Sequence, residues 1–76
     1  MKDLVTFIAT FLVDQPDAID VVESNQEGQI ILELRVAKED LGKVIGKQGR
    51  TARAIRTLLT ATAGKSNKKA RLDIID

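Results

Sequence analysis

The residues best suited to chemistry in this sequence form a short loop, Gly46-Lys47-Gln48-Gly49, which follows the apolar Ile45 and precedes Arg50. Two glycines allow the backbone to turn tightly and to approach another backbone with no side chain in the way. Lys47 supplies a positive charge and Gln48 supplies amide donors, which together suit a phosphate oxygen. The spacing therefore predicts a loop that holds a phosphate.

The charges of the chain are strongly divided between its two halves. Residues 1–40 carry three basic and nine acidic side chains, a net charge of −6, whereas residues 41–76 carry nine basic and two acidic ones, a net charge of +7. No acid occurs between Lys43 and Arg71. Most such runs are solvated surface, but here the glycine loop lies at the head of the run. The pattern therefore favours a polyanion as ligand.

The sequence argues against an enzyme and against a bound metal or cofactor. It contains no His and no Cys, and neither serine has an evident base. A P-loop is excluded because three residues, not four, separate Gly42 from Gly46, and because Gln48 follows Lys47 where Ser or Thr is needed. Glu39 and Asp40 lie at an expected helix start, where they would stabilise the helix dipole. No signal peptide or membrane span is evident, so we expect a cytoplasmic protein.

Hydrophobic periodicity predicts six elements in one domain, residues 1–76. They are a helix over 3–14, strands over 19–25 and 30–36, a short helix over about 38–45, a longer helix from Arg50, and a strand over 70–74. The first helix is expected to bury Leu4, Phe7, Ile8, Phe11 and Leu12, and the long helix to bury Ala54, Ile55, Leu58, Leu59 and Thr62. A turn at 25–28 joins the first two strands, and Gly64 is expected to cap the long helix.

This order, α-β-β-α-α-β, predicts an α+β fold. The first two strands form an antiparallel hairpin, and a two-helix crossover places the last strand parallel to the second. The expected product is a three-stranded mixed sheet with the helices packed on one face.

The order and the segment Val44-Ile45-Gly46-Lys47-Gln48-Gly49-Arg50 resemble a type II KH domain, and the length is similar to that of small single-KH bacterial proteins of the KhpA (YlqC-like) family. The resemblance implies binding of single-stranded RNA, with about four nucleotides clamped by the loop. It also implies self-association and partnership with a larger, multidomain KH protein. Many KH domains carry a larger aliphatic residue where this chain has Ala52, which argues against tight sequence selectivity.

On this interpretation RNA lies between the glycine loop with its two helices and the strand 30–36. The expected RNA-binding residues are Lys43, Ile45, Gly46, Lys47, Gln48, Gly49, Arg50 and Arg53. Basic side chains and loop amides would contact phosphates, while Ile45 and the strand 30–36 would form an apolar floor for bases. Such a protein would serve as an RNA chaperone or post-transcriptional regulator. The alternative is a protein–protein adaptor that dimerises or binds the larger KH partner, with incidental RNA binding.

Overall fold

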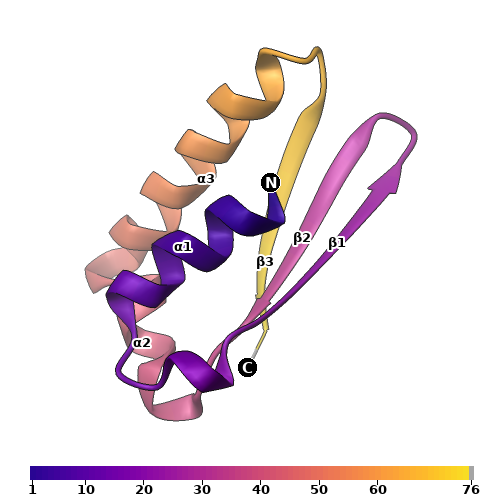
Figure 1. Cartoon of the computed structure of the whole chain (residues 1–76). Helices are drawn as coiled ribbons and strands as arrows, with labels where there is room; N and C mark the ends of the chain where they lie inside the picture. The colour runs from indigo at the N-terminus through magenta and orange to yellow at the C-terminus, as the bar shows by residue number, and fades with distance from the viewer. Residues whose placement is uncertain (76) are drawn as a thin grey trace.

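The computed structural model describes residues 1–75 and has the predicted order of elements (Figure 1). The main elements are α1 (Lys2–Leu12), β1 (Asp20–Gln26), β2 (Gln29–Arg35), α2 (Leu41–Ile45), α3 (Arg50–Gly64) and β3 (Lys69–Ile75). Three short 3₁₀ turns, η1 (Pro16–Ala18), η2 (Lys38–Asp40) and η3 (Lys47–Gly49), connect them. Within residues 1–75 no helix has the length and apolar character needed to cross a membrane.

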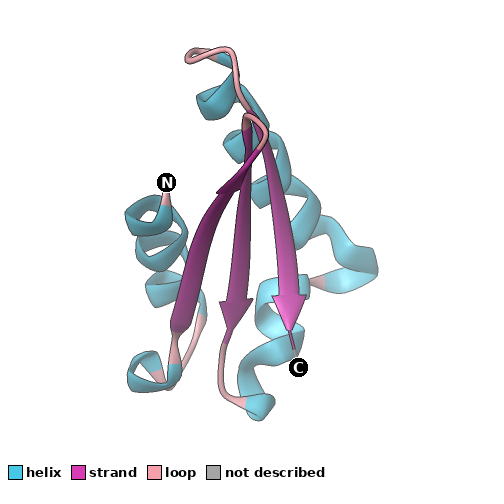
Figure 2. Ribbon diagram, turned by 90° about the vertical axis from the view of Figure 1, so that its right-hand side faces the viewer, coloured by secondary structure: helices cyan, strands magenta, loops and turns pink. Residues whose placement is uncertain are grey.

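The three strands form one mixed sheet in the order β1-β2-β3. β1 pairs antiparallel with β2 from Asp20↔Arg35 to Gln26↔Gln29, and β2 pairs in parallel with β3 from Gln29↔Lys69 to Arg35↔Ile75. All helices cover one face of the sheet, with α1 on the β1 side and α2 and α3 on the β3 side (Figure 2). The predicted α+β fold is therefore confirmed, and β3 is the edge strand nearest to α3.

A two-residue turn fixes the register of the hairpin. Glu27 has φ 51° and Gly28 has φ 79°, so both central residues adopt the positive φ values of a type I′ turn. This turn has the twist that antiparallel strands require, and it places Val21, Leu32 and Leu34 on the face that the helices cover.

The predicted inward stripe of α1 is wrong for its two aromatic residues. Phe7 is 62% exposed and Phe11 is 75% exposed, whereas Val5 and Ala9 are each 1% exposed and face the sheet. Apolar residues occupy most of the circumference of this helix, so its periodicity fits two different inward faces. The smaller side chains are buried because they allow α1 to lie close to the sheet.

The buried face of α3 is also rotated from the predicted one. Its buried residues are Ala52, Ile55, Leu59 and Ala63, while Leu58 is 46% exposed and Ala54 and Thr62 are exposed. Ala52 and Ala63 contribute little to a periodicity argument, and both lie on the buried face of α3. Ala52 is only 3% exposed, so this position belongs to the core.

The residue that caps the C-terminus of α3 is not the predicted one. The left-handed position is taken by Asn67, with φ 57°, and not by Gly64. The amides of Asn67 and Lys68 then donate to the carbonyls of Gly64 and Ala63, which satisfies two carbonyls at the helix end.

Candidate nucleic-acid interface

The glycine loop begins where α2 ends, and its first glycine fits in a space too small for any side chain. Gly46 has φ 79° and ψ 170°, and its amide donates to the carbonyl of Gly42 over 2.8 Å. A Cβ on Gly46 would overlap the hydroxyl of Thr51 and would lie 2.6 Å from its Cβ and 2.8 Å from its amide nitrogen. The loop therefore folds back closely against the first turn of α3.

The rest of the loop leaves backbone donors open beside the N-terminus of α3. Gln48 (φ 58°) and Gly49 (φ 72°) are both left-handed. The amides of Gly49 and Arg50 donate to the carbonyls of Gly46 and Lys47, whereas those of Lys47 and Gln48 have no acceptor among the described residues. No side chain caps α3, so the positive end of its dipole also lies beside this loop.

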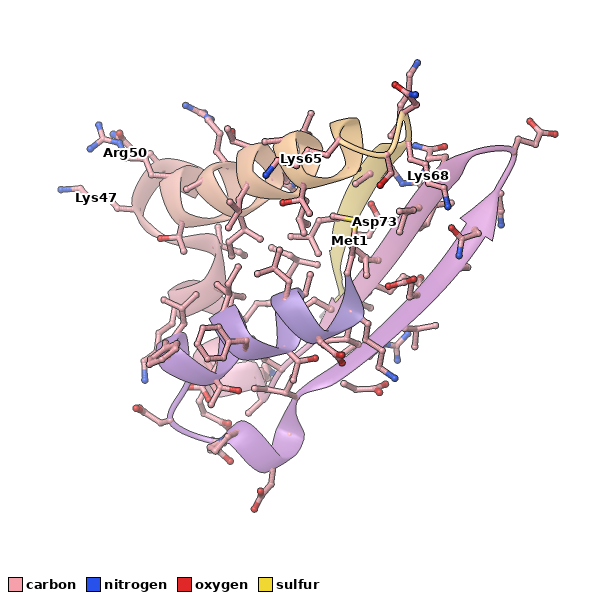
Figure 3. All side chains as sticks on the ribbon, turned by 45° about the horizontal axis from the view of Figure 1, so that its top comes forward. Met1, Lys47, Arg50, Lys65, Lys68 and Asp73 are labelled. Carbon is pink, nitrogen blue, oxygen red and sulfur yellow. The ribbon has the colours of Figure 1, made fainter. Side chains whose placement is uncertain are left out.

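Most of the predicted site residues lie together at this end of α3. Lys47, Gln48, Arg50 and Arg53 are exposed, and Ile45 keeps 38% of its surface exposed. Lys47 and Arg50 project away from the body of the protein (Figure 3). No described carboxylate lies within ion-pair distance of Lys47, Arg50 or Arg53. Their role in RNA binding stays a prediction.

Lys43 differs from the other predicted cations because it is paired with acids. Its ammonium contacts the carboxylates of Asp14 and Asp40, the latter over 3.2 Å. The hydrogen bonds to Asp14 and then to Asp40 raise the pKa of Lys43. The two carboxylates thus largely neutralise the charge of Lys43, which contributes less than Lys47 does to the positive potential outside the protein.

Asp40 is buried and connects two segments of the chain through hydrogen bonds, a role that the sequence did not indicate. It is 1% exposed, and its Oδ2 accepts hydrogen bonds from the amides of Asp14 (3.1 Å) and Gln15 (3.0 Å). Asp40 lies at the predicted helix start, as the N-cap residue of α2, but its side chain makes no cap hydrogen bond there. Burial alone would raise the pKa of Asp40, but the two amides and Lys43 together lower it below the ordinary aspartate value. Asp40 thus ties the end of α1 to the start of α2.

Acid is expected to break this junction. Because the folded-state pKa of Asp40 is lowered, its stabilising effect is complete above the ordinary aspartate pKa and is lost as the pH falls below about 4. Asp40→Asn should lower the melting temperature at pH 7 by about 5 °C or more. It should also lower by about one the number of protons that the protein takes up when it unfolds in acid. Circular dichroism melts between about pH 2.5 and 7 measure both effects.

The matched control for this experiment is Glu39→Gln. Glu39 is the exposed neighbour of Asp40 and accepts one hydrogen bond, from the side chain of Gln15. Its replacement should leave the acid dependence unchanged. The assignment to Asp40 is contradicted if the Asp40→Asn protein loses stability below about pH 4 as steeply as the native protein does.

The floor predicted for the bases is not available on β2. Ile30, Leu32 and Leu34 are 8%, 0% and 0% exposed and belong to the core beneath the helices. The free strand beside α3 is β3, where Nε of Arg56 donates to the carbonyl of Leu72 over 3.2 Å. β3, and not β2, is therefore the strand whose edge is free next to α3.

The second basic cluster is separate from the glycine loop. Lys65, Lys68 and Lys69 are exposed and follow the C-terminus of α3. Fifteen residues of helix span roughly 22 Å, so these lysines lie about that far from Lys47. Figure 3 shows Lys47 and Arg50 at one end of α3, and Lys68 beyond the other.

Comparison with known proteins gives consistent matches along the whole chain. Residues 2–74 match the family described as KhpA/KhpB, KH domain. Relatives named RNA-binding protein KhpA include that of Clostridium acetobutylicum, 57% identical over 99% of this chain and 100% of the relative. Those of Treponema pallidum (55%) and Bacillus subtilis (50%) are covered over 94% of their length by 99% and 100% of this chain. No solved structure gives a significant match.

Proposed function

This chain belongs to the KhpA/KhpB family of KH domains, and on that premise we propose that it binds single-stranded RNA through its Gly46–Gly49 loop. Relatives at 50–57% identity carry the name RNA-binding protein, which supports the choice of ligand. The site residues that follow are proposals about this chain.

The observation that carries the proposal is the set of open donors at the N-terminus of α3. The amides of Lys47 and Gln48 have no acceptor among the described residues, no side chain caps α3, and the helix dipole adds attraction for an anion. Gln48 holds a left-handed backbone that non-glycine residues seldom adopt, and such backbone is common at ligand sites. A phosphate of the RNA backbone fits this set of donors, and Lys47 supplies its counter-charge.

The RNA strand would then run along the β3 side of α3. Arg50 and Arg53 extend the positive field one turn along the helix, and Ile45 offers an apolar contact to a base. Phosphate contacts position the strand, and base identity is read at the β3 edge where Arg56 contacts Leu72. Lys43 supports the loop indirectly, through its ion pairs with Asp14 and Asp40.

We expect weak binding with a clear dependence on salt. About four nucleotides give only a few phosphate contacts, so the slope of log affinity against log salt should be roughly −2 to −3. Two sites held together, in a dimer or with a second RNA-binding protein, would raise the effective affinity.

The test is fluorescence anisotropy with a short unstructured RNA. Lys47→Asp/Gln48→Asp places two carboxylates where the phosphate should lie, and aspartate tolerates the left-handed backbone at position 48. We expect at least about a tenfold loss of affinity together with a shallower salt slope. Circular dichroism would verify that the fold is retained.

The matched control is Ser66→Asp/Lys68→Asp, which changes the net charge by the same amount at the far end of α3. It should leave affinity within about threefold of the native value, because that loop is remote from the site. Equal losses in the two variants would mean that RNA responds only to net charge. No loss in either variant would reject the glycine loop as the site.

A second candidate function is a protein–protein adaptor that dimerises or binds a larger KH protein. One observation favours it: Phe7 and Phe11 are exposed on α1. This function is compatible with RNA binding, because α1 lies on the β1 side and α3 on the β3 side of the sheet face that the helices cover (Figure 2).

A further inference from the structure

A hollow of about 780 Å³ lies between the turn of the β1–β2 hairpin and the turn that joins α3 to β3, and we call it the hairpin hollow. Its lining consists of Gln26, Glu27, Gly28, Gln29, Asn67 and Lys69. Both turns lie at the same end of the sheet, beyond the C-terminus of α3 (Figure 1, Figure 2). The amide of Lys69 donates to the carbonyl of Gly28 over 3.4 Å, so a hydrogen bond connects the two sides of the hollow. The glycine loop lies at the other end of α3.

The lining of the hairpin hollow is polar and carries three carboxamides, those of Gln26, Gln29 and Asn67. Within residues 1–75, none of these side chains makes a hydrogen bond to the protein. Each carboxamide can donate and accept at the same time, as the edge of a nucleobase requires. The volume lies in the range of small-ligand sites, which is roughly 300–1,000 Å³. Because most such sites are apolar, this lining favours a ligand with many hydrogen-bonding groups.

Lysines give this end of the molecule a positive charge. Lys69 lines the hollow, and Lys65 and Lys68 belong to the turn before it, at the end of α3 that lies away from Lys47 (Figure 3). The three lysines are exposed, and none has a described carboxylate within ion-pair distance. Glu27 is the acidic residue of the lining. Carboxamides suit a base and ammonium groups suit a phosphate, so the combination fits a nucleotide.

The surface between the hairpin hollow and the glycine loop suits a polyanion. α3 carries no acid along its 15 residues, and none occurs in the chain between Lys43 and Arg71. The helix spans roughly 22 Å. Phosphates are about 3.4 Å apart in a stacked strand and up to roughly twice that in an extended one, so about three to seven nucleotides cover this distance. An RNA strand held at the glycine loop can therefore reach the hollow without passing an acidic side chain of α3.

We propose that the hairpin hollow binds one nucleotide of an RNA strand that the glycine loop holds at another point. This inference rests on the proposed function, because the glycine loop supplies the first contact. The polar edge of the base contacts the three carboxamides, and the phosphate lies against Lys69. The full footprint is then about 8–12 nucleotides, of which about four belong to the loop. Once the loop holds the strand, the second contact forms at high effective concentration.

The test is fluorescence anisotropy with two unstructured RNAs, one of about 5 nucleotides that covers only the glycine loop and one of about 12 that spans both sites. Gln26→Thr/Gln29→Thr removes two carboxamides, keeps the net charge and places a good strand former at both positions. The affinity of this variant for the longer RNA should fall at least about fivefold, because one base loses its hydrogen bonds. Its affinity for the shorter RNA, which makes no contact there, should stay within about twofold of the native value.

The matched control is Asn25→Thr, which removes a carboxamide from the same strand. Asn25 is exposed but does not line the hollow, since neighbouring side chains of a strand point to opposite faces of the sheet. Its replacement should leave the affinity for both RNAs within about twofold of the native value. A comparison of the two RNAs on the native protein alone is not sufficient, because a longer strand also offers more registers to the glycine loop. Circular dichroism melts should place both variants within about 4 °C of the native protein.

Two-dimensional NMR identifies the occupant of the hollow. The longer RNA should shift the amide resonances of Gly28 and Asn67, and the shorter RNA should not. Equal loss of affinity for the longer RNA in Gln26→Thr/Gln29→Thr and in Asn25→Thr, or no loss in either, would overturn the proposal. So would saturation of the same resonances by a free mononucleotide at the concentration at which the longer RNA saturates them, because the occupant would then be a free nucleotide.

Lys47→Asp/Gln48→Asp separates this inference from the proposed function. We expect the change to weaken the binding of both RNAs. If it weakens neither, the proposed function fails, and the inference that rests on it fails too. If it weakens both RNAs while Gln26→Thr/Gln29→Thr weakens neither, only the hairpin hollow is rejected as a site.

Discussion

Replacement of Gly46 by alanine is expected to destabilise the protein by about 3 kcal/mol or more and to abolish the function of its loop. The backbone at φ 79° and ψ 170° is in a region that essentially only glycine adopts. The added Cβ would also lie 2.6 Å from Cβ and 2.8 Å from the amide nitrogen of Thr51, which the first turn of α3 holds in place. A domain of this size has a total stability of roughly 4–11 kcal/mol, so the loss is a large part of it.

Two other glycines provide matched controls in urea denaturation experiments. Gly49 has φ 72° but no atom within 4 Å of an added Cβ, so Gly49→Ala should cost only about 1–2 kcal/mol. Gly42 lies inside α2 with open space around it, so Gly42→Ala should stabilise the protein by up to about 1 kcal/mol. If Gly46→Ala costs no more than Gly49→Ala, the close approach of the loop to Thr51 is not a constraint on the fold.

The sequence predicts the fold well because its signals are local. Alternation in residues 30–36, the turn at 25–28 and the glycine loop each define an element within a few residues of its observed bounds. The two-helix crossover then determines that β3 runs parallel to β2. By contrast, the inward faces of α1 and α3 were predicted only in part, because both helices carry more apolar residues than one face can bury. The observed faces bury Val5, Ala9, Ala52 and Ala63.

The same contrast holds for the candidate site: some of its features follow from the local sequence, and others depend on tertiary contacts. The glycine loop and the exposed Arg50 and Arg53 follow from spacing within one segment. Asp40 does not, because its partners Asp14 and Gln15 are about 25 positions away and meet it only in the folded chain. The hydrogen bond from Arg56 to the carbonyl of Leu72 likewise forms only in the folded chain. The exposure of Phe7 and Phe11 depends on the rotation of α1, and so it was not evident from periodicity.

The rotation of α3 can be tested with two adjacent leucines. Leu59 is 1% exposed and packs in the core, whereas Leu58 is 46% exposed, although the sequence assigned both to the inward stripe. Leu59→Ala should therefore cost about 2–5 kcal/mol through lost burial and the cavity that remains. Leu58→Ala should cost less than about 1 kcal/mol, because most of the removed surface is already in water.

The comparison is well matched, since both changes replace leucine by alanine in the interior of the same helix and so change helix propensity equally. Urea denaturation with a shared slope gives the two free energies of unfolding. Leu59→Ala is expected to unfold at a markedly lower urea concentration, and Leu58→Ala close to the native midpoint. Equal midpoints for the two variants would mean that α3 presents the face predicted from periodicity. In that case Ala52 and Ala63 would turn outward, and Arg53 and Arg56 would leave the side of the helix on which the proposed RNA path depends.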